Sequence, residues 1–201
     1  MAGIAPSPPR AGPPTAAPAP ARTTTEPPPP QPSRTGVWIG IGTIAMSFAA
    51  LTSAMVVRQG AAPDWRHFQL PALLYVNTLV LLASSGTLEW SRRHISSGLA
   101  GVYVTLALGL LFVTGQVEAW RQLAAQGLFL ATAPSSAFFY VLTALHGLHV
   151  LGGLGGLVYV LHRVRGTTGP LPLAALGAAT LYWHFMGGLW LYLLVILVTR
   201  V

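Results

Sequence analysis

Long apolar stretches separated by short polar segments set the strongest limit on how this chain can fold. A helix that crosses a membrane needs about 20 mainly apolar residues, and segments of that kind recur along the chain after residue 34. The predicted spans are residues 36–57, 70–90, 98–118, 136–161 and 173–199. No strand-like alternation of apolar and polar residues accompanies them. We therefore predict an all-α fold, an integral membrane bundle of five transmembrane helices.

The composition also indicates a membrane protein. Of the 201 residues, 53% are hydrophobic and 7% are charged, whereas a soluble domain has about 25% charged residues. The absence of cysteine excludes disulfides, thiolate catalysis and Cys-ligated metal sites. The net charge of +7 is not accompanied by an aromatic-basic module, so we expect it to serve topology and lipid contact, with no nucleic acid as partner.

The first 34 residues differ in composition from the rest of the chain. They hold twelve of the 17 prolines, in runs such as "GPPTAAPAPA" and "TEPPPPQP". Such a segment has no apolar face to bury and favours extended, solvated backbone. We expect residues 1–34 to form a disordered Pro-rich tail, with a tethered docking arm as the alternative, and residues 35–201 to form the membrane domain.

The arginines predict how the bundle is oriented in the membrane. The side that holds the N-terminus carries seven arginines, in the tail and in the second and fourth connections, against four on the other side. Cytoplasmic segments carry the excess of basic residues, which places the N-terminus in the cytoplasm and the C-terminus outside. Arg92, Arg93 and Arg163 on the cytoplasmic side are candidates for lipid headgroup contact.

Aromatic residues divide into two predicted classes. Trp and Tyr near span ends serve as interfacial anchors, and we assign this role to Trp38, Trp65, Trp90, Trp120, Tyr182 and Trp183. Trp190 and Tyr192 lie deeper in the last span, where packing is the expected role.

Two histidines stand out in the apolar segment "FFYVLTALHGLHVLGGLGG". His146 and His149 lie three residues apart, on one face of a helix. A tetrahedral metal site would need further ligands, and two ligands one turn apart cannot approach opposite faces of a haem. We therefore predict no metal site, and expect neutral imidazoles that hydrogen-bond to neighbouring helices. Gly152 and Gly156, a G-x-x-x-G pair, predict close packing against a helix of this chain or of a partner.

The acidic residues do not indicate catalysis. Glu89 and Glu118 fall at the ends of their spans, with arginines three or four residues further on, so we expect ion pairs there. The middle of each predicted span lacks an acid, and no catalytic constellation is visible. Interhelical hydrogen bonds are instead expected from Asn77, Ser84, Ser85, Thr114 and Gln116.

Three segments resemble subunit III of the haem-copper terminal oxidases, the cytochrome c oxidase family. "FFYVLTALHGLHVLGG" resembles the family signature F-F-x-x-T-G-x-H-G-L-H-V, "YWHFMGGLWLYLLVILV" its closing Y-W-H-F-x-D-x-x-W-L-F, and "NTLVLLASSGTLEWSRRHI" its N-T-x-x-L-L-x-S helix. The motifs occur in the family's order, and five spans are typical of its shorter bacterial members. On these motifs fall Asn77, His146, Gly147, His149, Tyr182, Trp183, His184 and Trp190.

The resemblance implies an accessory subunit of an aerobic respiratory complex. In the family, haem and copper belong to subunits I and II, which would be the partners of this chain, and subunit III carries no redox cofactor. The implied roles are support of assembly, phospholipid binding and support of proton uptake by the catalytic subunit. By this resemblance the chain itself has no catalytic centre.

The sequence also departs from the family pattern. Ala144 replaces a usual glycine, Gly187 stands at the aspartate of the closing motif, and Ile44 stands where five-span members carry a buried glutamate. Roles tied to that glutamate are not expected here. Two alternatives stay open: a related subunit of a nitric oxide reductase or quinol oxidase, and a standalone haem-binding or transport membrane protein.

Overall fold

Five α-helices make up most of what the computed structural model describes, namely residue 3 and residues 32–61, 63–93, 98–166 and 173–201 of the chain. The helices are α1 (Pro32–Ala61), α2 (Leu73–Arg93), α3 (Gly98–Ala125), α4 (Pro134–Gly166) and α5 (Leu173–Arg200). No strand occurs among the described residues, and the predicted all-α fold is confirmed. The tail predicted to be disordered lies almost wholly outside the described residues.

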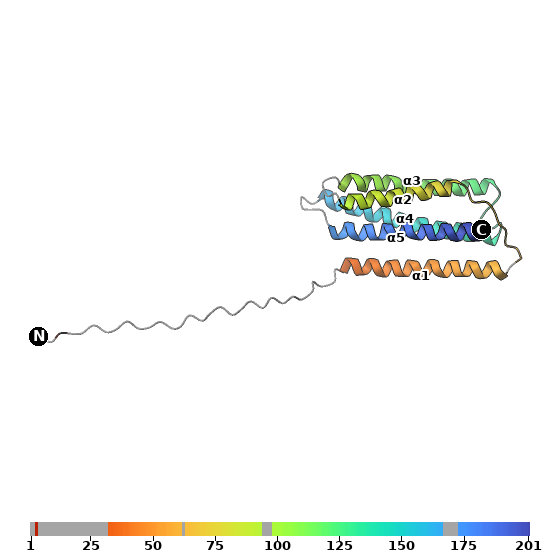
Figure 1. Ribbon diagram of the computed structural model, residues 1–201, viewed down its shortest axis with the longest axis horizontal. Coiled ribbons are helices and arrows are strands. Elements are labelled where there is room, and N and C mark those ends of the chain that lie inside the picture. The colour runs from red at the N-terminus through yellow and green to blue at the C-terminus, as the bar shows by residue number, and fades with distance from the viewer. Residues whose placement is uncertain (1–2, 4–31, 62, 94–97, 167–172) are drawn as a thin grey trace.

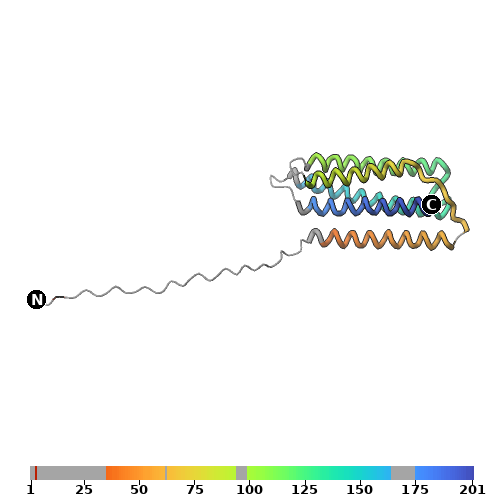
Figure 2. The backbone as a smooth tube through the Cα atoms, viewed as in Figure 1, coloured from red at the N-terminus to blue at the C-terminus, as the bar shows by residue number. Residues whose placement is uncertain are grey.

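Four of the helices close into a ring, and the fifth packs on its outside. Contacts between α2 and α3, α3 and α4, α4 and α5, and α5 and α2 complete the ring. The first helix, α1, contacts only α4 and α5 among the described helices, and Figure 1 shows it along one side of the bundle. In Figure 2 the chain passes back and forth along the long axis, so successive helices run in opposite directions.

Not every helix is apolar enough to meet the criterion for a membrane span. Four of the described helices combine the length and apolar composition needed to cross a membrane, over Thr35–Ala61, Leu99–Ala125, Pro134–Arg163 and Ala175–Arg200. The 21-residue α2 does not, because polar residues such as Asn77, Thr78, Ser84 and Ser91 interrupt it. These four side chains are buried against other helices. That α2 also crosses the membrane remains our prediction.

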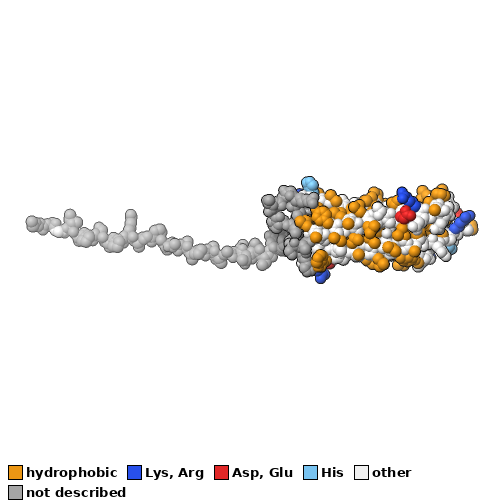
Figure 3. All heavy atoms as spheres, turned by 90° about the horizontal axis from the view of Figure 1, so that it is seen from above, with side chains coloured by type: hydrophobic (Ala, Val, Ile, Leu, Met, Phe, Trp, Pro, Cys, Tyr) orange, Lys and Arg blue, Asp and Glu red, His pale blue; other side chains and the backbone are white. Residues whose placement is uncertain are grey.

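The outer surface is suited to lipid. Large apolar side chains such as Ile39, Met46, Leu79, Leu148 and Val195, which lie on α1, α2, α4 and α5, are at least 61% exposed. Figure 3 shows apolar side chains spread along the visible face, with charged ones at the two ends and one pair of opposite charges between the middle and one end. A water-soluble monomer rarely exposes so continuous an apolar surface, and this one fits the hydrocarbon region of a bilayer.

The interior of the bundle is aromatic, and this corrects part of the predicted anchor set. Trp183 is 1% exposed, so its assignment as an interfacial anchor is wrong: it lies three turns into α5, facing the ring. Trp38 and Trp90 are more than half exposed, as anchors would be. Trp120 is half-buried and donates to Thr143 Oγ1 at 3.0 Å. Trp190 is fully buried, as predicted.

A glycine of α3 leaves room for a polar side chain of α2. A Cβ built on Gly115 would meet the Asn77 side chain, with Cγ and Nδ2 both at 2.8 Å. The Asn77 amide occupies this space and donates from Nδ2 to the carbonyl of Phe112 at 3.3 Å. Glycine therefore lets a polar side chain of α2 reach the backbone of α3.

We predict that Gly115→Ala destabilises the bundle by about 1–3 kcal/mol, the usual cost of an overpacked interior. The added methyl group must displace the Asn77 amide and break its hydrogen bond. Thermal unfolding of the detergent-solubilised protein measures the effect. The control is Gly86→Ala, because a Cβ there meets nothing within 4 Å; equal loss in both variants would contradict the assignment.

Candidate functional site

Two buried tryptophans of α5 bind two hydroxyl groups of α2. Trp183 Nε1 donates to Ser84 Oγ at 3.0 Å, and Trp190 Nε1 donates to Thr78 Oγ1 at 2.9 Å. Seven residues separate the two tryptophans, which places them on one face of α5. We call these two pairs, together with the rings of Phe112 and His146 and the Asn77 amide that pack beside them, the central seam.

Each hydroxyl of the central seam has a second partner in its own helix. Ser84 Oγ donates to Leu81 O at 2.7 Å, and Thr78 Oγ1 donates to Leu74 O at 2.8 Å. A hydroxyl can donate once and accept as well, so each satisfies its own helix and the indole together. Further along, Thr87 Oγ1 and Thr105 Oγ1 lie 2.9 Å apart between α2 and α3. Of the predicted interhelical polar residues, Asn77 and Ser84 are therefore confirmed.

His146 lies at the centre of the seam without the hydrogen bonds that the sequence predicted. Its side chain is 0% exposed and packs against two rings, with centroid distances of 5.9 Å to Phe112 and 5.0 Å to Trp190. Neither imidazole nitrogen has a hydrogen-bond partner. Aromatic contact, edge-on to Phe112 and tilted over Trp190, holds the ring in place.

Two further polar residues also differ from prediction. Gln116, one turn from Phe112 on α3, is buried with both amide atoms unpartnered. Thr114 is exposed and donates to Leu111 O of its own helix at 2.9 Å. A sequence pattern identifies which polar residues enter a span, but the rotation of the helix decides which of them meets a neighbour.

His149 also bonds within its own helix rather than to a neighbour. Its Nδ1 lies 2.7 Å from Leu145 O, and its ring packs edge-on to Phe48 of α1 at 5.8 Å. The contact with α5 uses its backbone, because Tyr182 Oη donates to His149 O at 3.0 Å. Within the described residues, no three His, Cys, Asp or Glu side chains gather as metal ligands do.

The glycine-rich turns of α4 contact α5 through a different glycine from the predicted pair. A Cβ on Gly153 would lie 3.1–3.2 Å from the rings of Tyr182 and Trp183. A Cβ on Gly152 would only reach Tyr182 Oη at 3.9 Å, and one on Gly156 or Gly147 meets nothing within 4 Å. The Gly152–Gly156 pair therefore does not pack closely against another described helix of this chain, and of the two predicted alternatives, contact with a partner helix at this exposed face stays a prediction.

A charged cluster at one end of the bundle joins α2 to α5. Glu89 accepts from Arg92 at 2.9 and 3.0 Å and from Arg93 Nε at 2.8 Å, which confirms the predicted ion pairs. These bonds raise the pKa of the Arg92 guanidinium. The sequence did not predict that His184 Nε2 of α5 lies 3.7 Å from the same carboxylate.

The remaining candidate for lipid headgroup contact is Arg163, and two positions that depart from the family motifs are Gly187 and Ile44. Arg163 Nε donates to Tyr159 Oη at 3.1 Å, and its guanidinium lies over the Tyr159 ring. Gly187, at the family's aspartate position, is buried, and a Cβ there would lie 3.3 Å from Ser85 Oγ. Ile44 is partly buried against the core, so an apolar side chain fills the family's glutamate position.

Comparison with known proteins identifies the chain's relatives. The family model described as cytochrome c oxidase subunit III matches residues 46–199. A probable cytochrome c oxidase subunit 3 of Mycobacterium leprae is 35% identical, over 81% of this chain and 84% of the relative. The cytochrome c oxidase subunit 3 of Synechocystis is 31% identical, over 74% and 67%. The quinol oxidase subunit 3 of Bacillus spizizenii is 29% identical, over 79% and 82%.

Another relative is matched over a shorter length. A probable cytochrome c oxidase subunit 3 of Mycobacterium bovis is 35% identical to this chain over 126 residues, which is 62% of the relative's length.

We predict a measurable coupling between Trp183 and Ser84. Ser84→Ala leaves a buried indole N–H without an acceptor, and Trp183→Phe removes the donor, so the double variant loses less stability than the sum of the two. Coupling energies of hydrogen bonds inside membrane proteins average about 0.6 kcal/mol and reach about 1.7. A double-mutant cycle on unfolding in detergent measures this energy.

Ser47→Ala is the control for this cycle. Ser47 is exposed and donates only to Thr43 O of its own helix. Additive effects of Ser84→Ala and Trp183→Phe would show that the indole–hydroxyl bond does not stabilise the bundle.

Proposed function

The chain belongs to the cytochrome c oxidase subunit III family, and we propose that it serves as the accessory, non-redox subunit of an aerobic respiratory haem-copper oxidase. One observation carries the proposal: the family match extends over residues 46–199, from the middle of α1 to the end of α5. It therefore covers the whole four-helix ring and not an isolated motif.

The geometry supports a structural role for the family motifs. The motif residues Trp183, Trp190 and Asn77 bind groups of neighbouring helices, and His146 packs between aromatic rings. Their contacts hold helices in register. A subunit that stabilises an oxygen-reducing partner and supports its proton uptake needs such a rigid membrane scaffold.

The partners of the proposed subunit are subunits I and II, which would hold the haems and copper. We expect no redox cofactor in this chain and expect bound phospholipid, with Arg92, Arg93 and Arg163 as headgroup contacts at the cytoplasmic end. The N-terminus lies in the cytoplasm and the C-terminus outside the inner membrane. The uneven distribution of arginines supports this orientation.

A quinol-oxidizing complex is the second candidate. A relative described as quinol oxidase subunit 3 aligns over nearly the same share of the chain as the cytochrome c oxidase relatives. The two candidates share the accessory role and differ in the electron donor to the catalytic subunit.

Extraction from the native membrane in mild detergent tests the proposed function. We expect a tagged chain to be recovered with a haem-copper subunit I, identified by mass spectrometry and by its haem spectrum. A copper-binding subunit II and turnover with reduced cytochrome c would assign the first candidate, and turnover with quinol alone the second. Recovery without any haem-copper subunit would contradict both.

The exposed glycines of α4 give a prediction about assembly. Gly156→Leu and Gly152→Leu should reduce recovery of subunit I several-fold while the isolated chain keeps its unfolding temperature, because both positions face outward. Gly153→Leu should lower that temperature, because its side chain would clash with Tyr182 and Trp183. His149→Phe should leave the haem spectrum unchanged. Unchanged recovery in both outward variants would place the partner elsewhere.

A further inference from the structure

The unpaired polar atoms in the interior of the bundle belong to only two residues. Among the described residues, four buried side-chain nitrogen or oxygen atoms lack a hydrogen-bond partner: both imidazole nitrogens of His146 on α4 and both amide atoms of Gln116 on α3. The two side chains are 0% and 3% exposed. A buried polar group without a partner is costly, and nearly all such groups in proteins are paired. Two orphaned groups therefore indicate a partner that they share.

The contacts between α3 and α4 place Gln116 at the level of His146. One turn before Gln116, the Phe112 ring packs on His146 with the centroids 5.9 Å apart. One turn after it, Trp120 donates to Thr143 Oγ1 at 3.0 Å. Residues four apart lie on one face of a helix, so the Gln116 amide faces α4 between these two contacts. The orphaned atoms of the two helices thus lie in one region of the interface.

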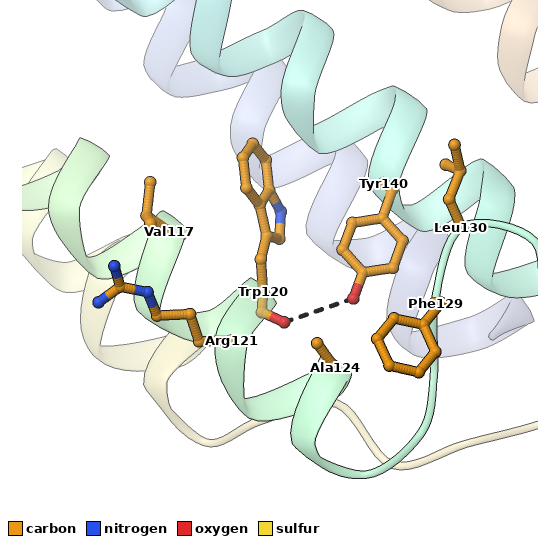
Figure 4. Close-up of a pocket in the computed structure, with 7 residues that line it drawn as sticks. All are labelled: Val117, Trp120, Arg121, Ala124, Phe129, Leu130 and Tyr140. Carbon is orange, nitrogen blue, oxygen red and sulfur yellow. Dashed lines mark hydrogen bonds between the residues drawn. The ribbon is translucent and has the colours of Figure 1, made fainter.

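The polar side chains around this region are already bound. In Figure 4, Trp120 of α3 and Tyr140 of α4 face each other, and Tyr140 Oη reaches the Trp120 carbonyl at 3.4 Å. The same hydroxyl donates to the backbone of the preceding loop at 2.8 Å. Thr143 Oγ1 accepts from Trp120 and donates to its own helix at 2.7 Å, and Trp190 Nε1 donates to Thr78. These groups do not complete the hydrogen bonding of the orphaned pair.

The chemistry of the pair suits a molecule that both donates and accepts hydrogen bonds. A neutral imidazole has one N–H donor and one acceptor nitrogen, and a glutamine amide has two N–H donors and an acceptor oxygen. The Trp190 ring lies over His146 at 5.0 Å with 32° between the ring planes, so it covers a face of the imidazole and leaves the nitrogens at the ring edge. An apolar molecule would leave all four atoms unpaired. A metal ion would need more ligands than the described His, Asp and Glu residues bring together.

We propose that a water molecule is bound inside the bundle, where it bridges the Gln116 amide of α3 to the facing nitrogen of His146 on α4. Buried waters typically make about three hydrogen bonds to groups that would otherwise be unpaired. Phe112 and Trp120 enclose this site along α3. The water adds a hydrogen-bonded link between two helices of the ring and satisfies atoms that the side chains alone leave unpaired. The site does not depend on the proposed oxidase role, since it requires only the fold of this chain.

Nuclear magnetic resonance on the full chain in detergent tests the site, with nitrogen-15 in histidine, glutamine and tryptophan. Cross-relaxation between water and side-chain N–H protons reports direct contact with a bound water. We expect water cross-peaks at the Gln116 amide protons, which are assigned by their loss in Gln116→Met. The Trp183 N–H is the control, because it is 1% exposed and donates to Ser84. It should show no cross-peak.

A variant of the glutamine tests the bridge to the histidine. Gln116→Met keeps a side chain of similar length but removes the amide, so the facing nitrogen of His146 should lose its hydrogen bond and shift its signal. The His146 signals are assigned by their loss in His146→Phe. The matched control is Gln126→Met, the same substitution at an exposed position after α3. It should leave the His146 signals unchanged.

A double-mutant cycle on unfolding in detergent measures the link between the helices. The coupling between Gln116→Met and His146→Phe should be roughly threefold in the unfolding equilibrium constant, the average for hydrogen bonds between membrane helices. Gln126→Met and His146→Phe should act independently. Equal independence of Gln116→Met and His146→Phe would contradict the bridge.

The measurement on the unmodified chain decides the proposal even where a variant fails to fold. Absence of a water cross-peak at Gln116 would overturn the proposal, and so would cross-peaks of equal strength at Gln116 and Trp183, which would indicate general wetting of the interior. Coupled variants without a water cross-peak would indicate a direct bond between Gln116 and His146 in place of the bridge. Unshifted His146 signals in Gln116→Met would place the water on Gln116 alone and also overturn the bridge.

Discussion

The binding of indole N–H groups of α5 by hydroxyl groups of α2 sets the arrangement on which the rest of the bundle depends. In an apolar interior an unpaired N–H costs far more than a paired one gains, so the two helices can slide or rotate only by losing these bonds. With α2 and α5 held in register, Trp190 forms one side of the aromatic site of His146. The Asn77 amide reaches α3 from the same helix, through the space that Gly115 leaves. A few polar contacts between the helices thus close the ring, although the helix surfaces are otherwise uniformly apolar.

Much of the fold could be predicted because span length is imposed by the bilayer. The apolar runs located all five helices. The helix ends in the structure differ from the predicted span ends mostly where a helix continues past its apolar part. Thus α3 runs on to Ala125, through the charged pair at Glu118 and Arg121. Such extension needs no apolar residues, since backbone hydrogen bonds continue into the interface, and the apolar pattern alone cannot detect it.

The contacts inside the bundle were harder to predict. Trp183 looked like an interfacial anchor because α5 begins near it in the sequence, but three turns of helix carry it into the ring. His146 and Gln116 were expected to bond across helices, and instead His146 packs on rings while both amide atoms of Gln116 lack partners. Only the relative rotation of two helices decides such outcomes, and a single sequence does not contain that angle. Local pairs three or four residues apart, such as Glu89 with Arg92 and Arg93, were predictable because one helix fixes their geometry.

The outlying position of α1 has a consequence for how the molecule is made. Its contacts join residues at opposite ends of the chain: Thr52 Oγ1 lies 2.8 Å from Tyr192 Oη, and Trp65 after the helix donates to Arg200 O. The chain is synthesised from its N-terminus, so α1 is made before α4 and α5, the two described helices that form its docking surface. The α2–α3 hairpin, by contrast, can pair as soon as it is inserted. Although α1 is made before the other described helices, it is therefore fixed in place only once α4 and α5 are present, when Phe48 packs against His149 and Thr52 meets Tyr192.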